Sequence, residues 1–397
     1  MRCRETAAFA VAAILAAAAA APAQEFKLGA SLRNYNFYRL DNKAGDDSSR
    51  HDTEFAALRL VPVASFGEHV KFESNMVLEM TSPPGSPAAA LVTGRSRTYL
   101  PLDYGRNPTA AIEMTGYFDR LNVRIHTSKA DLVVGRQAIT WGVNTLWPTL
   151  DLFAPFTPTQ IDRDYKAGVD AVRLTVPIES HSEFQVVGAA LGDSPRRDGA
   201  GGALLRVSAG AADFGVMGGW FHRDVVAGGF MAVNIHGALL RGEASWTRAG
   251  DALDRLRRPK FWRGGLGLER QLSSSWNWMM EVARDGYGDT DVLGYPAILA
   301  SDRMRRGEVR GLGRWYAGTV LTWKVHPLVT LTNTALVNCS DTSAVWIPVL
   351  AWSVASGFEI ITGAQLAFGP PPGPAGVPGS EYGTYTNKVL AGFKLYL

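Results

Sequence analysis

Apolar and polar residues alternate along much of this chain, in segments of about ten residues separated by shorter polar or Gly-rich stretches. In 70–80, for example, Phe72 and Leu78 fall on one face of an extended chain, while Lys71 and Glu79 fall on the other. The same pattern recurs at 121–126, 203–208, 238–247, 261–270, 276–285, 314–325, 328–337 and 357–368. A period of two is the side-chain period of a β-strand. The sequence therefore predicts an all-β chain.

Two classes of β protein fit this pattern, a large soluble sandwich and an outer-membrane barrel. After residue 24 the sequence has no run of about 18 or more apolar residues, so it predicts no transmembrane helix. Only 19% of residues are charged, while Gly (42) and Trp (11) are plentiful. Several tryptophans fall on apolar faces near the expected strand ends, namely Trp262, Trp276, Trp278, Trp315 and Trp323. Tryptophan in such positions is typical of a membrane-interface girdle and favours the barrel.

The expected connections alternate between short and long. Short turns are predicted near 65–69, 127–130, 179–182, 209–211, 235–237, 271–275, 326–327 and 353–356. Longer segments fall at 39–52, 81–113, 139–168, 249–260, 286–312 and 369–386, with brief ones near 192–199, 223–225 and 339–343. This spacing predicts an antiparallel transmembrane β-barrel of about 18 strands, with 16 possible, whose short turns face the periplasm and whose long loops face outward.

The N-terminal segment 1–23 reads as a secretory signal peptide. Arg2 and Arg4 precede an apolar run that ends in Ala21-Pro22-Ala23, a small-x-small cleavage site. We therefore expect export by the Sec route to the outer membrane of a Gram-negative cell, with 24–397 forming one barrel domain. Removal of Cys3 would leave Cys339 as the single cysteine, so no internal disulfide is expected.

The segment 139–168 carries the main functional hint. It contains three prolines, which exclude a continuous strand or helix, and it contains many large apolar residues. We expect Trp141, Trp147 and Phe153 to pack against the barrel wall, so that the loop folds inward and narrows the lumen. Its charged run 162–166 either lines the pore or fixes the loop to the wall.

Three short motifs in and before this loop resemble a known family. They are Gly135-Arg136-Gln137, Trp141-Gly142, and Leu150-Asp151-Leu152-Phe153 followed by Pro155. Together they resemble a motif of a proteobacterial outer-membrane porin-like family and, more loosely, of alginate-export-type barrels. The likeness covers about 130–175 and implies an outer-membrane pore without naming a solute. The final segment 388–397 is similar to the terminal strand that the barrel-assembly machinery recognises, although it ends in Leu397 rather than an aromatic residue.

Charged residues on the expected inner face are candidates for lining the pore, because rings of arginine or carboxylate tune ion selectivity. Glu243 and Glu281 share that face. The candidates for pore lining and constriction are Arg124, Arg136, Asp151, Asp162, Arg163, Asp164, Arg173, Arg241, Arg263 and Arg314. Arg136 breaks the alternation of its segment, and a β-bulge would re-aim it into the lumen. Pairing of these charges with one another is the alternative to a role in selectivity.

Other classes of function find little support. The sequence has no G-x-S-x-G, H-E-x-x-H or paired-cysteine motif, so we expect no enzyme, metal site or cofactor. The net charge of +3 comes from 40 basic and 37 acidic residues without a basic block, which argues against nucleic-acid binding. The prediction is an outer-membrane channel that passes small solutes and contacts membrane lipid. The alternatives are an export or assembly subunit that works with periplasmic partners, a plugged surface scaffold, and, for the assembly state, a homo-oligomer.

Overall fold

The computed structural model describes residues 25–40, 53–108, 111–179, 181–192, 194–251, 254, 258–373 and 377–397. The predicted signal peptide and the acidic segment 41–52 lie outside these residues. Within them the chain forms nineteen strands joined by turns, loops and a few short helices. No helix in these ranges has the length and hydropathy to cross a membrane.

The strands in chain order are β1 (Glu25–Arg39), β2 (Thr53–Phe66), β3 (Val70–Ser82), β4 (Asp103–Pro108), β5 (Glu113–His126), β6 (Asp131–Gln137), β7 (Val169–Glu179), β8 (Ser182–Ala190), β9 (Gly199–Ala209), β10 (Ala212–Phe221), β11 (Asp224–Ile235), β12 (Ala238–Arg248), β13 (Lys260–Gln271), β14 (Trp276–Asp285), β15 (Trp315–His326), β16 (Val329–Asn338), β17 (Ser343–Ala355), β18 (Phe358–Phe368) and β19 (Lys388–Tyr396). The short helices are η1 (Pro87–Leu91), α2 (Pro195–Asp198), η2 (Val292–Gly294), α4 (Tyr295–Leu299), α5 (Asp302–Arg305) and η4 (Tyr382–Thr384).

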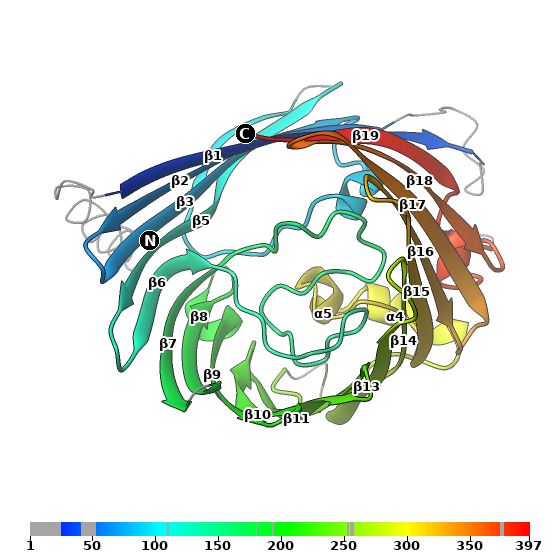
Figure 1. Cartoon of the computed structure of the whole chain (residues 1–397). Helices are drawn as coiled ribbons and strands as arrows, with labels where there is room; N and C mark the ends of the chain where they lie inside the picture. The colour runs from blue at the N-terminus through cyan, green and yellow to red at the C-terminus, as the bar shows by residue number, and fades with distance from the viewer. Residues whose placement is uncertain are drawn as a thin grey trace.

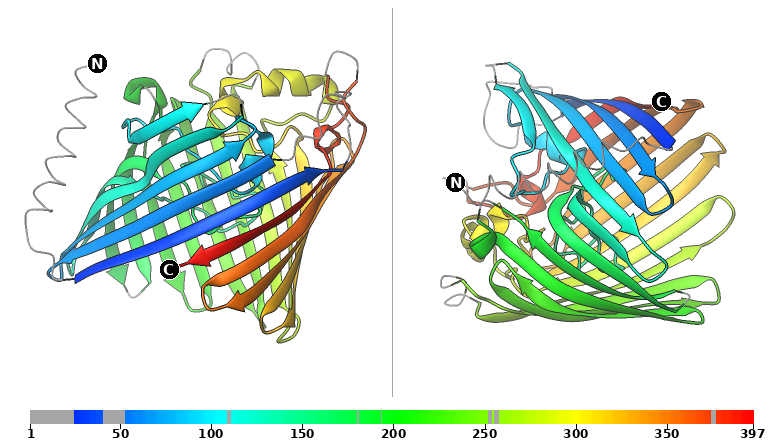
Figure 2. Two further views of the ribbon diagram at one scale, coloured as in Figure 1. Left: turned by 90° about the horizontal axis from the view of Figure 1, so that it is seen from above. Right: turned by 90° about the vertical axis from the view of Figure 1, so that its left-hand side faces the viewer.

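Eighteen of these strands form a closed antiparallel barrel (Figures 1 and 2). Each pairs with its neighbours in the chain, and β1 closes the cylinder against β19. The remaining strand, β4, pairs only with residues 113–117 of β5, on the edge that β6 occupies further down. The prediction of an all-β barrel of about 18 strands is thus confirmed, and β4 is an addition that the sequence did not indicate.

Alternation produces the two faces of the wall. In β14, Met280 and Val282 are 38% and 43% exposed on the outer face, while Glu281 between them is fully buried on the inner face. Outer-face tryptophans mark the two ends of the apolar band. Trp315 and Trp323 of β15 lie eight residues apart, about 27 Å along the strand. Strands of such barrels are tilted by about 35–45°, so this length spans a height of roughly 20 Å, close to that of the ~25 Å apolar band between the two aromatic girdles.

The long connections lie at one end of the barrel, together with brief ones after β10 and β16, and tight turns form the other end. Tight turns follow β2, β5, β7, β9, β11, β13, β15 and β17. The turn after β11 uses His236 and Gly237, both with positive φ, which suits a two-residue hairpin. Both ends of the described chain lie at the short-turn end, as an even number of strands requires: Leu397 exchanges backbone hydrogen bonds with Ala30 of β1.

Candidate functional site: a loop across the lumen

The lumen loop, residues 138–168, connects β6 to β7 and runs inside the barrel (Figure 1). It leaves the wall at Gly135, whose φ of +116° is open mainly to glycine. A Cβ at this position would lie 2.3 Å from the carbonyl oxygen of Leu121. Gly135 therefore allows β6 to turn away from β5 before the strand has reached the rim.

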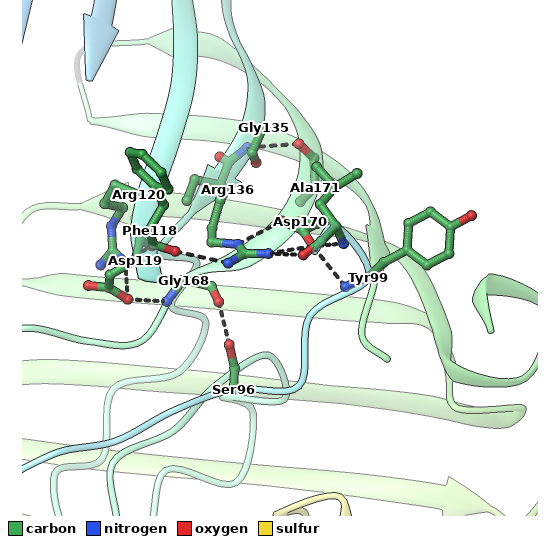
Figure 3. A network of polar contacts seen from close by, with 12 residues as sticks. Ser96, Tyr99, Phe118, Asp119, Arg120, Gly135, Arg136, Gly168, Asp170 and Ala171 are labelled. Atoms are coloured by element: carbon green, nitrogen blue, oxygen red, sulfur yellow. Dashed lines mark hydrogen bonds and ion pairs between the residues drawn. The ribbon is translucent and has the colours of Figure 1, made fainter. Parts of the chain in front are cut away.

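Arg136 fills the break that this departure leaves in the sheet (Figure 3). Its side chain is 3% exposed. The guanidinium donates to the Phe118 and Leu100 carbonyls at 2.9 and 2.8 Å and pairs with Asp170 at 2.8 Å. Asp170 in turn accepts the backbone N–H groups of Tyr99 and Leu100. The pair thus joins β5, β7 and the segment before β4, and supplies hydrogen bonds that β6 no longer makes.

Aromatic side chains fix the lumen loop to two stretches of the wall. Trp141 and Phe153 pack edge to face at 5.1 Å inside an apolar cluster formed with β7 to β11. Trp147 stacks on Tyr316 of β15 at 5.4 Å, in a second cluster formed with β14 to β18. All three predicted packing residues are buried, at 1%, 7% and 5% exposure for Trp141, Trp147 and Phe153.

Two wall carboxylates hold the loop backbone between these clusters. Glu281 of β14 accepts the N–H groups of Thr145, Leu146 and Trp147 at 2.9, 3.1 and 2.6 Å. Glu243 of β12 accepts those of Val143 and Thr149 at 3.1 and 2.5 Å. The alternation placed both glutamates on the inner face, but nothing in the sequence indicated that their partners would be backbone groups of a distant loop.

The charged run at the end of the loop contacts the strands that close the barrel. Asp162 pairs with Arg33 of β1 at 2.6 Å and accepts from Tyr35. Asp164 pairs with Lys394 of β19 at 2.8 Å and with Arg33 at 3.1 Å. Burial alone would raise the pKa of Asp164, but hydrogen bonds from Lys394 and Tyr396 and the charges of Lys394 and Arg33 lower it below its ordinary value.

Arg163, between these two acids, organises the loop itself. Its guanidinium donates to the carbonyl oxygens of Thr157, Pro158 and Gln160 at 3.1, 2.9 and 3.1 Å. A longer bond of 3.3 Å reaches Thr145 O, on the opposite arm of the loop. Burial lowers the pKa of Arg163. One side chain thus ties together both arms of the lumen loop.

Lys166 and Asp151 close the base of the loop. They lie 2.6 Å apart, and Lys166 also donates to Ile139 O at 2.6 Å. Arg310, from the connection between β14 and β15, donates to Pro148 O and Asp151 O at 2.6 and 2.7 Å. Arg310 thus ties the connection between β14 and β15 to the lumen loop.

Cavities lie on both sides of the loop. On the long-loop side are one of about 390 Å³, lined by Asp151 and Arg263, and one of about 1020 Å³, lined by Thr53 and Pro372. On the other side a cavity of about 320 Å³ is lined by Arg163 and Glu269. A further cavity of about 360 Å³ shares Glu269 and extends to Gly237 and Ser274 at the short-turn end.

The segment 157–160, which we call the partition, separates the two sides. Thr157 lines both cavities on the long-loop side. Pro158 and Thr159 line the 1020 Å³ cavity and also the 320 Å³ cavity beyond it. Gln160 lines the 390 Å³ and 320 Å³ cavities. The partition is therefore one short stretch of chain thick, and Arg163 holds its backbone.

The remaining candidate residues lie on the inner wall. Arg263 pairs with Asp285 at 2.9 Å and faces the 390 Å³ cavity. Arg241 pairs with Glu269 at 2.7 Å and donates to Thr145 Oγ1 of the loop. The other three are Arg124 near the end of β5, Arg173 in the middle of β7, and Arg314 in the connection just before β15. Arg124 pairs with Asp131 at 3.6 Å, Arg173 lies across Val133 from Arg124, and Arg314 donates to Gly288 O at 3.3 Å.

The structure therefore brings Asp151, Asp162, Arg163, Asp164, Arg241 and Arg263 together at the lumen loop, and it leaves Arg124, Arg173 and Arg314 apart from it. Sequence reasoning did not find Arg33, Lys394 and Arg310, which hold the loop from elements far away in the chain. Alternation indicated which face a residue occupies but not its partner. Within the described ranges no group of His, Cys, Asp and Glu is arranged to hold a metal ion.

Comparisons with known proteins support the fold. No protein-family model matches the sequence, and no curated protein matches it. Solved barrels match the structure along nearly its whole length. Pseudomonas aeruginosa OccK11 (OpdR) has a TM-score of 0.57 at 11% identity and covers 94% of this chain and 97% of its own. Acinetobacter baumannii OccAB4 gives 0.55 at 9%, covering 94% and 98%. Pseudomonas aeruginosa OpdK, solved with vanillate, gives 0.55 at 9%, covering 94% and 99%.

Proposed function

We propose that this chain is an outer-membrane channel that passes small solutes through a lumen narrowed by the loop 138–168. The observation that carries the proposal is the arrangement of cavities. They lie on both sides of a loop that is anchored to opposite stretches of the wall, and the residues of the partition line cavities on both of these sides. A barrel built as a closed scaffold would need side chains to fill this space.

The location follows from the same features. An outer face with an apolar band and tryptophans at both ends suits a lipid bilayer, and the segment 1–23 supplies an export signal. We infer that the long loops face the cell exterior and the short turns face the periplasm of a Gram-negative cell. Insertion by the barrel-assembly machinery, as the segment 388–397 suggests, belongs to this proposal.

The solute class follows from the cavities and their charges. Paired ions such as Arg263–Asp285 and Arg241–Glu269 border the path, so the solute we propose is small and polar. The structure of OpdK with vanillate concerns a small organic molecule at that neighbour, and we extend this size class to the present chain. The likeness of 130–175 to porin-like and alginate-export-type barrels remains a prediction about closer kinship. We propose no catalytic activity and no cofactor.

Electrical recording tests the proposal. Residues 24–397, refolded in detergent and added to a planar lipid bilayer, should give discrete conductance steps. Arg163→Ala should raise the conductance or its fluctuation, because the partition loses three of the hydrogen bonds that hold its backbone. Arg270→Ala is the matched control, because it removes an arginine from an exposed position at the short-turn end of β13. A folded protein that never conducts would favour the plugged scaffold, and a protein that conducts only with a co-purified periplasmic partner would favour the export subunit.

A further inference from the structure

Two cations face each other on the outer surface of the barrel near its long-loop end. The strand register places Arg248 of β12 directly opposite Lys260 of β13. Both side chains are exposed. Their neighbours Thr247 and Phe261 point inward and are 3% and 6% exposed, so the two cations point outward. Directly opposed residues in an antiparallel pair have Cβ atoms roughly 5 Å apart, and like charges there are destabilising.

Aromatic residues lie directly below this pair, on the membrane side. Trp246 stands opposite Trp262, and they are 41% and 48% exposed. The guanidinium of Arg284 in β14 lies over the Trp262 ring at 3.8 Å and near the Trp315 ring at 5.7 Å. Three cations from three neighbouring strands, β12 to β14 (Figure 1), therefore lie at the level of the tryptophan girdle or just beyond it.

Neither Arg248 nor Lys260 has an ion-pair partner among the residues that the structure describes, unlike the inward-facing arginines Arg241 and Arg263. The region just beyond an aromatic girdle is where lipid headgroups lie. A phosphate there would neutralise the opposed cations, and each basic residue near an anionic lipid surface contributes favourably to binding. Arginine and lysine are also the side chains best suited to phosphate oxygens.

We propose that Arg248, Lys260 and Arg284 form a binding site for the phosphate groups of a lipid in the outer leaflet, with Trp246, Trp262 and Trp315 contacting its acyl or sugar portion. The inference rests on the outer-membrane location given under the proposed function. It goes beyond that function because it assigns a ligand to the outside of the barrel rather than to the lumen.

Native mass spectrometry in detergent tests this site with lipid A that carries two phosphates. The double variant Arg248→Glu with Lys260→Glu should bind lipid A at least tenfold more weakly than the natural protein. The control is Arg270→Glu with Lys27→Glu, which reverses two exposed cations at the short-turn end. It should bind lipid A as the natural protein does. Heat-modifiable migration on gels establishes that both variants are folded, and Arg248→Ala alone should give an intermediate loss.

Three results would overturn the proposal. These are equal binding of lipid A by the charge-reversed protein, equal binding of dephosphorylated lipid A by the natural protein, and displacement of lipid A by millimolar inorganic phosphate. The last would assign the site to free phosphate. Conductance is a separate readout, because neither Arg248 nor Lys260, the two residues that the variant changes, lines one of the lumen cavities described above. A protein that binds lipid A through these residues but never conducts would refute the channel and support the lipid site.

Discussion

Where β6 leaves the wall, the carbonyls of Phe118 and Leu100 and the carboxylate of Asp170 all depend on Arg136. The residue before it, Gly135, makes the turn, and the residue after it, Gln137, donates to Val133 O and Ala171 O. The Gly-Arg-Gln run that resembles a family motif is thus explained by a local structural need. Gly135 allows the turn, and the side chains of Arg136 and Gln137 satisfy backbone groups that a departing strand would leave unpaired.

Arg136→Ala should lower the free energy of unfolding by about 3–5 kcal/mol, because it leaves the buried Asp170 carboxylate without its counter-ion and two carbonyls without their donor. The measurement is the temperature at which the barrel loses its heat-resistant gel migration. Arg124→Ala is the control, because its pair with Asp131 is half exposed and such pairs contribute about 0–1 kcal/mol. The double variant Arg136→Met with Asp170→Leu should be more stable than Arg136→Ala alone. If Arg136→Ala and Arg124→Ala lose their heat-resistant migration at the same temperature, Arg136 does not stabilise this break in the sheet.

The lowered pKa of Asp164 predicts that the attachment of the lumen loop to β1 and β19 depends on pH. Its folded pKa lies below the ordinary carboxyl value, so its pairing with Lys394 and Arg33 stabilises the fold above that ordinary value, about 3.9. The stability is lost as the pH falls from there through the lowered pKa. Channel noise should therefore rise below about pH 4, and Asp164→Asn should show the same noise at pH 7. If the noise of Asp164→Asn at pH 7 is as low as that of the natural protein, the Asp164 carboxylate does not help to hold the lumen loop.

The strands are the elements that the sequence predicted best. Each short turn was expected within two or three residues of its place, because period-two alternation stops where the chain reverses. β4 was not expected, since its six residues, Asp103–Pro108, carry no alternation and pair with β5 only because β6 has left that edge. A strand that forms only because a neighbouring strand leaves part of a sheet edge free has no pattern of its own in the sequence.

The lumen loop is the element whose removal is most informative. Deletion of 145–160 should leave a folded barrel, because no strand pairing involves these residues, and should raise conductance and the uptake of larger solutes. Glu281 and Glu243 would then lose four of the five backbone donors that they accept. We therefore expect the deletion to be more stable with Glu243→Gln and Glu281→Gln than without them. A heat-resistant deletion protein that conducts like the natural one would refute the constriction.

At the scale of the whole molecule, an even number of strands and one end rich in loops predict a single orientation in the membrane. In a Cys339→Ser background, cysteine at Leu293 in the connection 286–314 should react with a membrane-impermeant reagent on intact cells. Cysteine at Ser274, in the turn 272–275, should react only after the outer membrane is broken. Cysteines in 41–52 and 370–379 should react on intact cells, as at Leu293. Cysteines in 65–69 and 326–327 should react only after the outer membrane is broken, as at Ser274. The reverse order of labelling would invert the proposed topology.

Much less of the candidate site than of the fold followed from sequence. The apolar load of 139–168 predicted an inward loop because Trp141, Trp147 and Phe153 need burial. The ionic partners did not follow, because Asp162 meets Arg33 and Lys394 across 129 and 232 residues of chain. Local patterns determine which side of a strand a residue occupies, whereas ion pairs depend on closure of the whole cylinder.

The contacts of Asp162 and Asp164 with β1 and β19 also couple two steps of assembly. The first and last strands meet only when the cylinder closes, and the same junction supplies the cations that receive the loop. If the β1–β19 junction closed with the loop outside, Arg33 and Lys394 would lose these carboxylate partners. The two cations lie directly opposite each other in the strand pair, and like charges in such a position are destabilising when nothing neutralises them. Closure of the barrel at β1 and β19 and insertion of the lumen loop therefore stabilise each other. A closed barrel with the lumen loop inside is favoured over one with the loop outside.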